Sequence, residues 1–178
     1  MLVTLHLTGH IRLVFVDESG FTMQPYLPYG WQKKGQQIRI FARNNRKRLN
    51  LLGFMSADLH LSVYQNEKSI NSQFFINAVE DYITKIDKPT VLILDNSPIH
   101  RCKAVYYLLE KWQSKDLYVF FLPKYAPHLN LIEILWRRMK YKWLNKKHYH
   151  SFRSLKKQIK NIITHFGGEY TINFNELF

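Results

Sequence analysis

The sequence predicts an α/β fold in which helices pack on a mixed sheet of five strands. In the first half of the chain, short apolar stretches are separated by turn-forming residues, which is typical of antiparallel strands. In the second half, apolar strand-like stretches alternate with stretches whose apolar residues recur at helical spacing. This alternation is typical of strands joined by helices that pack on the sheet. With 178 residues, of which 46% are hydrophobic, the chain is long enough for one domain with a substantial core.

Three strands are predicted in the first half of the chain. Residues 11–20, IRLVFVDESG, form an apolar strand that ends at Asp17 and is followed by a turn. Residues 25–37 are rich in turn formers, and we expect a hairpin or a loop there. Residues 48–65 predict two strands that are joined near Ala57.

Helices and strands are predicted to alternate from there on. The apolar residues of the segment 71–86 recur at i, i+1, i+4 and i+5, which predicts a helix. The continuous apolar run of residues 90–95, TVLILD, is typical of a strand buried on both faces. A helix is expected to follow, with Ser97 as its N-cap, Pro98 in its first turn and its end near Gln113.

The last strand and two further helices complete the predicted order. Residues 117–122, LYVFFL, predict the fifth strand. A strong helical pattern begins at Asn130 and runs to about Asn145. The last helix is expected over residues 151–165, and the glycine pair that begins at Gly167 ends it.

The charge balance points to a polyanionic partner. The chain has 26 Lys and Arg against 13 Asp and Glu, a net charge of +13 that suits nucleic acid or an anionic membrane surface. Its single cysteine, Cys102, excludes an intramolecular disulfide and fits a reducing compartment. We read no secretory leader, and no apolar run approaches the ~18 residues that span a bilayer. We therefore expect an intracellular protein without a membrane partner.

Three carboxylates take positions that could form one site. Asp17 ends the first strand, Asp95 ends the buried strand, and Glu133 lies in the first turn of the helix that begins at Asn130. Ligands bind at the carboxyl ends of strands in open sheets, where Asp17 and Asp95 could lie side by side. Clustered carboxylates repel one another, and Mg²⁺ or Mn²⁺ relieves the repulsion because hard cations prefer oxygen ligands. Two such ions about 4 Å apart can activate the attacking oxygen and stabilise the leaving oxygen of phosphoryl transfer.

Each of these carboxylates also has a purely structural interpretation. Asp17 could cap the turn that follows it, and Asp95 could form an Asx turn before the next helix. Glu133 could complete a near capping box with Asn130. Glu18, the adjacent acid, points to the opposite face if strand geometry continues past Asp17. The three structural interpretations are independent of one another, whereas one metal site explains all three residues.

Four segments together carry a resemblance to a known family. They are VFVDESGF (14–21), GWQKKGQ (30–36), LILDNSPIH (92–100) and FLPKYAPHLNLIEILWRRMK (121–140). In these segments and in their order, the chain resembles the catalytic domain of DDE transposases, from the superfamily that joins mariner-type elements with many bacterial insertion sequences. The last two segments are the most specific. They combine an Asp-Asn pair, a His four residues after the Asn, a Pro-rich loop, Asn-x-Ile-Glu and a Trp three residues further on.

The resemblance implies a fold, a chemistry and a set of residues. It implies an RNase H-like fold, with Asp17, Asp95 and Glu133 as the catalytic triad that binds two Mg²⁺ or Mn²⁺ ions. It implies hydrolysis of DNA at element ends and attack of the freed 3′-hydroxyl on target DNA, without a covalent protein–DNA intermediate. It also implies a homodimer in a bacterial cytoplasm or nucleoid. Asn96 and His100 would support the triad, with His100 orienting a phosphate or a water. Alternatively, His100 is an ordinary helix-surface histidine.

The resemblance also sets expectations about domain organisation. We expect residues 1–145 to form the catalytic domain and residues 146–178 to form a basic helical extension of the same domain. Members of the family usually carry an N-terminal helix-turn-helix region that recognises the element ends. Because Asp17 comes almost at once, we expect that region to be absent here and possible as a separately encoded partner. His128 and Leu131 stand where the family usually has Glu and Pro, a change that removes some helix pre-organisation at most.

Basic and aromatic residues are candidates for contact with DNA. Trp31 could stack on an unpaired base, or it could pack over a hairpin. Trp136 belongs to an apolar helical stripe and is expected in the core. The basic runs would neutralise phosphates, although some of their members could be an ordinary solvated helix face. The candidate phosphate contacts are Lys33, Lys34, Arg43, Arg46, Lys47, Arg48, Lys124, Arg137 and Lys140.

Three functions stay open at the level of the sequence. The first is a DNA strand-transfer nuclease, and the second is another RNase H-like nuclease that cuts RNA–DNA hybrids or junctions. The third is an inactive transposase remnant that only binds DNA or multimerises. Joined target DNA among the products separates the first from the second, and magnesium-dependent nicking that an Asp95→Asn change removes excludes the third.

Overall fold

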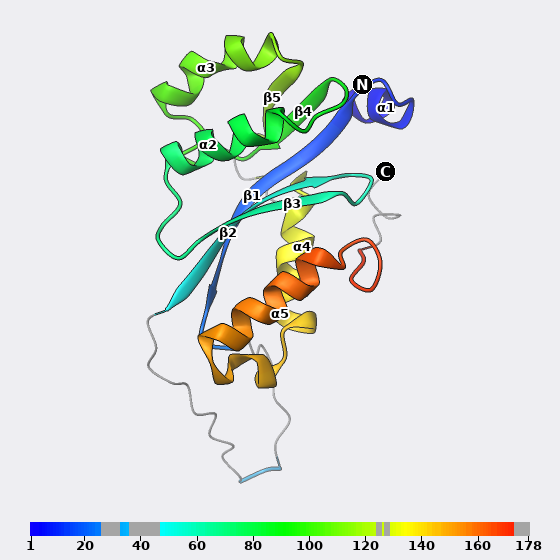
Figure 1. The fold of residues 1–178 in the computed structure, drawn as a ribbon. Coiled ribbons are helices and arrows are strands. Elements are labelled where there is room, and N and C mark those ends of the chain that lie inside the picture. The colour runs from blue at the N-terminus through cyan, green and yellow to red at the C-terminus, as the bar shows by residue number, and fades with distance from the viewer. Residues whose placement is uncertain (26–32, 36–46, 124–125, 127–128, 173–178) are drawn as a thin grey trace.

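The structure is a computed structural model that describes residues 1–25, 33–35, 47–123, 126 and 129–172. Within these residues, helices lie on both sides of one sheet (Figure 1). The loop predicted for residues 25–37 lies largely outside the described residues. None of the described helices is long and apolar enough to cross a membrane.

The sheet has five strands in the order β3-β2-β1-β4-β5. The pairs β1–β2 and β2–β3 are antiparallel, whereas β1–β4 and β4–β5 are parallel. The predicted mixed five-stranded sheet flanked by helices is therefore confirmed. The strands are β1 (Arg12–Thr22), β2 (Arg48–Ser56), β3 (Leu61–Asn66), β4 (Thr90–Leu94) and β5 (Leu117–Phe121).

Five α-helices are described, and four of them were predicted. The short N-terminal α1 was not predicted. After α4, one π-helical turn (Met139–Trp143) and one 3-10 turn (Lys146–His150) lead to α5. The α-helices are α1 (Leu2–Leu7), α2 (Ser72–Ile83), α3 (Lys103–Gln113), α4 (Ile132–Arg138) and α5 (Phe152–Thr164).

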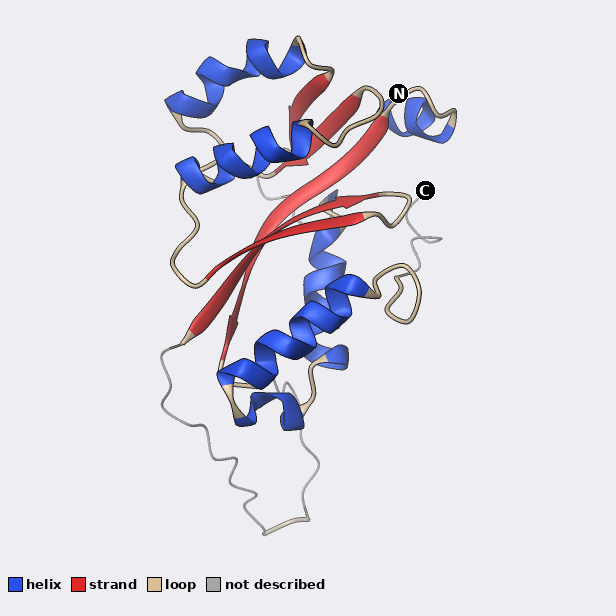
Figure 2. Cartoon of the chain, in the orientation of Figure 1, coloured by secondary structure: helices blue, strands red, loops and turns tan. Residues whose placement is uncertain are grey.

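Alternation along β1 divides the core into two halves, one on each side of the sheet. Leu13 and Phe15 pack in the half that α4 and α5 cover, whereas Val14 and Val16 pack in the half that α2 and α3 cover. Figure 2 shows the long β1 strand in the middle of the sheet between these two sets of helices. Trp136 of α4 is 4% exposed, which confirms its predicted place in the core.

The prediction that the first strand ends at Asp17 was wrong, because β1 continues to Thr22. Its antiparallel pairing with β2 runs from Val14 opposite Ser56 to Thr22 opposite Arg48. This ladder and the burial of Phe21 outweigh the local turn preference of the residues after Asp17.

The prediction that Ser97 caps a helix was also wrong, because α3 begins only at Lys103. The backbone N–H of Ser97 donates to Oδ1 of Asp95 at 3.0 Å, which closes an Asx turn at the end of β4. The backbone N–H groups of His100 and Arg101 both donate to the Ser97 carbonyl, so the chain makes one isolated turn here. This turn directs the His100 side chain into the core, where it is 0% exposed.

Candidate functional site

Strand pairing brings Asp17 and Asp95 to the same end of the sheet. The parallel strands β1 and β4 place Phe15 opposite Ile93. Continuing this register by two residues sets Asp17 opposite Asp95, which directly follows β4. Asp17 shares its face of β1 with Phe15, so its side chain lies on the side of the sheet that α4 covers.

A glycine lets α4 approach the sheet beside Asp17. Gly53 of β2 pairs with Asp17 across the antiparallel ladder. A Cβ atom on Gly53 would lie only 2.7 Å from Cδ1 of Ile132 and 2.7 Å from Cζ2 of Trp136, so only glycine permits this contact. Because Glu133 follows Ile132 in the first turn of α4, the close packing brings Glu133 to the Asp17 region.

Asn130 ties the start of α4 to β1. The N-cap of α4 is Leu131, which makes no side-chain capping bond. The near capping box that was the alternative interpretation of Glu133 therefore does not form. The Asn130 side chain is 2% exposed, and its Nδ2 donates to the backbone carbonyl of Val16 at 3.1 Å. Val16 precedes Asp17, so this hydrogen bond links the strand that carries Asp17 to the helix that carries Glu133.

The three carboxylates act on one another electrostatically. Burial, followed by the charges of Glu18, Asp95 and Glu133, raises the pKa of Asp17 to about 7. Partial burial and the charge of Asp95 also raise the pKa of Glu133. Without a cation, Asp17 therefore holds a proton for much of the time at neutral pH.

The donor chemistry of this cluster fits a hard divalent cation. Among the described residues, no three His, Cys, Asp or Glu side chains lie close enough together to hold a metal ion. Asp17, Asp95 and Glu133 nevertheless offer only oxygen ligands, and their mutual repulsion is the effect that Mg²⁺ or Mn²⁺ would relieve. Oxygen donors and mutual repulsion are therefore the two features of these side chains that match the preference of such a cation.

His100 lies between two carboxylates inside the protein. Its Nδ1 is 2.7 Å from Oδ1 of Asp95, and its Nε2 is 2.9 Å from Oε1 of Glu18. Burial alone would lower the pKa of His100, but these two hydrogen bonds outweigh it and raise the pKa to about 9. His100 is therefore protonated at neutral pH and donates from both nitrogens, and its bond to Asp95 is the main cause that lowers the pKa of Asp95.

This position differs from both sequence interpretations of His100. The ring precedes α3 and is 0% exposed, so it is not a helix-surface histidine. Being enclosed, it does not face a phosphate or a bulk water as it stands. Instead it holds Asp95, and its partner Glu18 is a residue that sequence reasoning treated only as a rival to Asp17. The only signal for Glu18 was its predicted position on the opposite face of the strand.

Asn96 and Arg101 form a second network at the end of β4. Nδ2 of Asn96 donates to the backbone carbonyl of Leu122 at 2.5 Å, which fixes the amide against the end of β5. Oδ1 of Asn96 accepts a hydrogen bond from Nη1 of Arg101 at 2.8 Å. Sequence reasoning missed Arg101, because no pattern in the sequence reveals this contact.

Comparison with known proteins decides the family. A family model described as DDE superfamily endonuclease matches residues 12–156, which is most of the chain. The chain belongs to the DDE superfamily endonuclease family. The resemblance to DDE transposases that the sequence motifs carry is thereby confirmed.

Individual relatives of this DDE endonuclease are distant. The uncharacterized 39 kDa protein of insertion element IS630 from Shigella sonnei is 24% identical over 127 residues, covering 70% of this chain and 36% of that protein. The solved Mos1 strand transfer complex has a TM-score of 0.62 at 17% identity and covers 92% of this chain and 51% of that one. The mariner Mos1 paired end complex with Mg has a TM-score of 0.58 at 20% identity and covers 85% and 48%. These likenesses confirm the RNase H-like fold. The chain spans 36% of the IS630 protein and about half of each of these two Mos1 chains.

Two of the predicted phosphate contacts of this DDE endonuclease lie beside its carboxylates. Arg137 follows Glu133 by four residues on α4, and its charge opposes the rise in the pKa of Glu133 without reversing it. Nζ of Lys140 lies 5.4 Å from the centroid of the Phe21 ring. Burial lowers the pKa of Lys140, and the charge of Asp17 acts in the opposite sense.

The other predicted DNA contacts are spread more widely. Lys33, Lys34, Lys47 and Arg48 are exposed, and Nζ of Lys47 lies 5.8 Å from the Phe152 ring centroid. Four predicted contacts lie outside the described residues: Trp31, Arg43, Arg46 and Lys124.

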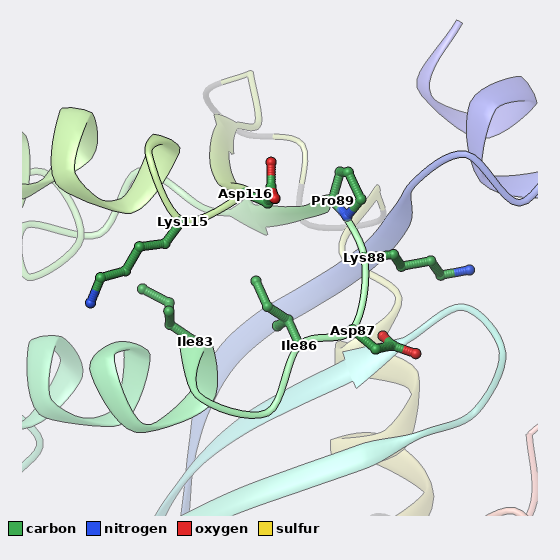
Figure 3. Close-up of a pocket in the computed structure, with 7 residues that line it drawn as sticks. All are labelled: Ile83, Ile86, Asp87, Lys88, Pro89, Lys115 and Asp116. Carbon is green, nitrogen blue, oxygen red and sulfur yellow. The ribbon is translucent and has the colours of Figure 1, made fainter.

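A pocket lies at the opposite end of the strands (Figure 3). Pro89 precedes β4 and Asp116 precedes β5, so the pocket opens at the N-terminal ends of these strands, whereas Asp95 follows the C-terminal end of β4. This pocket is therefore separate from the carboxylate cluster of the DDE endonuclease. Its lining residues are Ile83, Ile86, Asp87, Lys88, Pro89, Lys115 and Asp116.

Proposed function

We propose that this DDE endonuclease chain is the catalytic domain of a DNA transposase. It hydrolyses DNA at the ends of a mobile element and joins the freed 3′-hydroxyl to target DNA. The observation that carries the proposal is the packing of α4 on Gly53, because it brings Glu133 to the end of the sheet where Asp17 and Asp95 lie.

Asp17, Asp95 and Glu133 would hold the divalent cations, two per site by the family resemblance. Bound Mg²⁺ or Mn²⁺ would supply activation of the attacking oxygen and stabilisation of the leaving oxygen. A solved Mos1 paired end complex contains Mg, which supports this choice of cation for a chain of the same fold. Hydrogen bonds from His100 and Ser97 hold Oδ1 of Asp95, so Oδ2 would be the oxygen that binds the cation.

The partner in this proposal is DNA. The net charge of +13 favours a polyanion, and Arg137 and Lys140 lie beside the carboxylates where a bound phosphate would add negative charge. A solved Mos1 relative is a strand transfer complex. By the family resemblance, this chain would act as a homodimer on paired element ends. Recognition of the end sequences would come from a helix-turn-helix region, which a separate chain could supply.

The C-terminal residues belong to the same domain in this proposal. Leu155 and Ile159 of α5 share a core cluster with Ile132 and Trp136 of α4. Residues 146–172 would therefore steady the helix that carries Glu133, in addition to adding positive charge.

Magnesium-dependent nicking and joining of DNA tests the proposal. The test mixture contains the purified chain, any helix-turn-helix chain encoded beside it, a DNA fragment that carries the flanking ends and a supercoiled target plasmid. It should yield nicked and joined products in Mg²⁺ or Mn²⁺. Asp95→Asn should yield none, whereas Lys88→Ala, at the opposite end of β4, should behave as wild type. Cleavage of an RNA–DNA hybrid without joining would favour another RNase H-like nuclease, and DNA binding without any cleavage would favour an inactive remnant.

A further inference from the structure

Glu18 and His100 form a support for the carboxylate cluster on the opposite face of the sheet. Glu18 follows Asp17 in β1, so its side chain points to the α2 and α3 side, where Val16 is buried. There Oε1 of Glu18 lies 2.9 Å from Nε2 of His100, and Nδ1 of His100 lies 2.7 Å from Oδ1 of Asp95. One strand thus supplies Asp17 on one face and a support for Asp95 on the other.

We propose that Glu18 is a positioning residue that acts through His100 to orient the Asp95 carboxylate for cation binding. The inference rests on the proposed function, because it assumes that Asp95 is a cation ligand. Neither Glu18 nor His100 is assigned direct contact with the cation or with DNA.

The burial of His100 makes this support rigid. The ring is 0% exposed, and its centroid lies 4.6 Å from that of Phe75, so it has little freedom to turn. The Asp95 side chain, by contrast, is 46% exposed and would rotate freely without a fixed donor. Because His100 and the Ser97 backbone N–H both hold Oδ1, the other oxygen keeps one direction.

The hydrogen bond from Nε2 of His100 to Glu18 keeps the His100 ring in this position. Without an acceptor at Oε1, Nε2 of His100 would be a buried donor with no partner, and the ring would move to find one. Asp95 would then lose its fixed orientation. Glu18→Gln keeps an oxygen acceptor at the same place, whereas Glu18→Ala removes it.

Glu80 offers a matched control on the same face of the sheet. Its Oε1 accepts a hydrogen bond at 2.9 Å from Nε1 of Trp112, which is also 0% exposed. Glu80→Ala therefore removes the acceptor of another buried ring N–H without touching Asp95. A general loss of stability should appear in both alanine variants, but a loss of cation affinity should appear only in Glu18→Ala.

The test is Mn²⁺ binding to the full chain, measured by electron paramagnetic resonance without DNA. Glu18→Ala should weaken Mn²⁺ binding about 10- to 100-fold, as loss of a supporting group does at other metal sites. Glu18→Gln should retain most of the affinity, and Glu80→Ala should retain all of it. Thermal melting confirms that each variant is folded. If Glu18→Ala does not fold, Glu18→Asp replaces it, because the shorter side chain moves the acceptor oxygen away from His100. Glu18→Asp should likewise weaken Mn²⁺ binding.

Two results would overturn the inference in different ways. Wild-type affinity in Glu18→Ala or Glu18→Asp, or an equal loss in Glu80→Ala, would refute the role of Glu18 and leave the proposed function standing. Absence of Mn²⁺ binding in the wild-type chain would refute the metal site itself, and the inference with it.

Arg101 carries a second and independent inference. Its Nε donates to the Tyr106 hydroxyl at 2.9 Å, its Nη1 donates to Oδ1 of Asn96 at 2.8 Å, and its Cζ lies 5.3 Å from the Phe121 ring centroid. All of these partners are uncharged, and no carboxylate pairs with Arg101 among the residues that the structure describes. The guanidinium is thus held in one place with its charge uncompensated.

We infer that Arg101 binds a phosphate of DNA that lies across the ends of β4 and β5. Asn96, which holds Arg101, directly follows Asp95, so the guanidinium stands at the rim of the carboxylate cluster. A planar guanidinium that is already oriented loses little freedom when it forms two parallel hydrogen bonds to a phosphate. This inference also rests on the proposed function for its choice of ligand.

DNA binding in EDTA tests the role of Arg101 apart from cleavage. With a labelled duplex and fluorescence anisotropy, Arg101→Ala should weaken binding and lower the slope of log affinity against log salt by about 1. Arg101→Lys should bind with an affinity between those of wild type and Arg101→Ala, because lysine keeps the charge but not the planar pair of donors. Tyr106→Phe should also have an intermediate affinity, because it removes one hydrogen bond that orients Arg101. Lys88→Ala should match wild type. A wild-type affinity and slope in Arg101→Ala would refute the inference, even if cleavage is observed, and an absence of wild-type binding would refute it together with DNA as the partner.

Discussion

His100 shows how one buried side chain can join both faces of the sheet. It reaches Glu18 on the α2 and α3 side and Asp95 at the end of β4. The contact with Glu18 does not follow from the sequence, because the two residues are 82 positions apart. The contact with Asp95 was missed because the sequence predicted a helix from Ser97, whereas α3 begins only at Lys103. The pattern did predict that Glu18 and Asp17 point to opposite faces, since alternation depends only on strand geometry.

The first prediction separates a ligand from its support. His100→Ala should lower magnesium-dependent cleavage about 10- to 100-fold without abolishing it, because Asp95 keeps its carboxylate but loses its fixed orientation. Asp95→Ala should abolish cleavage. Initial rates on the same DNA substrate measure both changes, and equally mild effects would contradict the assignment of Asp95 as a ligand.

The second prediction concerns Asp17 and the stability of the cation-free protein. Its pKa is raised from 3.8 to about 7, so between these pH values the folded state holds a proton that the unfolded state has released. Asp17 therefore lowers the free energy of unfolding as pH rises through this range. In EDTA, Asp17→Asn should gain stability over wild type as pH rises from about 4 to about 7. Urea denaturation at several pH values measures the difference, and a constant difference would be the contrary result.

At the scale of elements, the sequence predicted the type of each strand better than its ends. The apolar run of β4 identifies a buried strand by itself, because such a run fits both covered faces of a parallel sheet. The end of β1 could not be predicted, since the pairing that extends it comes from β2, far along the chain. The start of α3 was also misplaced. The Ser97 N–H donates to the Asp95 side chain and closes a turn there, so the helix begins only at Lys103.

The third prediction tests the link between α4 and β1. Asn130→Ala should lower the free energy of unfolding by about 1–3 kcal/mol, because the buried Val16 carbonyl loses its donor. It should also weaken Mn²⁺ binding, because Glu133 is no longer held beside Asp17. Asn71→Ala removes the side-chain cap of α2 and should cost about 1 kcal/mol with no change in Mn²⁺ affinity. An equal effect of both variants on Mn²⁺ binding would contradict the positioning role of Asn130.

At the scale of the whole molecule, the family and the fold could be predicted from the sequence, but the site only in outline. Asp17, Asp95 and Glu133 were proposed from strand ends and motifs, both of which are local features. The close packing that brings Glu133 toward Asp17 depends on Gly53, whose lack of a side chain carries no functional signal in the sequence. Arg101 was missed because its anchors come from separate parts of the fold, Asn96 at the end of β4 and Tyr106 in α3.

The fourth prediction follows from the overall charge. With a net charge of +13, the chain should bind duplex DNA with an affinity that falls steeply as salt rises from about 50 to 200 mM. Counterion release from the phosphates is the physical reason. Anisotropy titrations at several salt concentrations measure the slope, and an affinity that stays flat over this range would show that phosphate contacts contribute little.

The most direct test of the shared carboxylate site is a Mn²⁺ titration of four proteins by electron paramagnetic resonance. The wild-type chain should bind Mn²⁺, and each of Asp17→Asn, Asp95→Asn and Glu133→Gln should bind it much more weakly while remaining folded, since each removes one charged ligand from the same cluster. If any one of the three variants bound Mn²⁺ as tightly as wild type, that residue would lie outside the site, and these three side chains would not form a common metal centre.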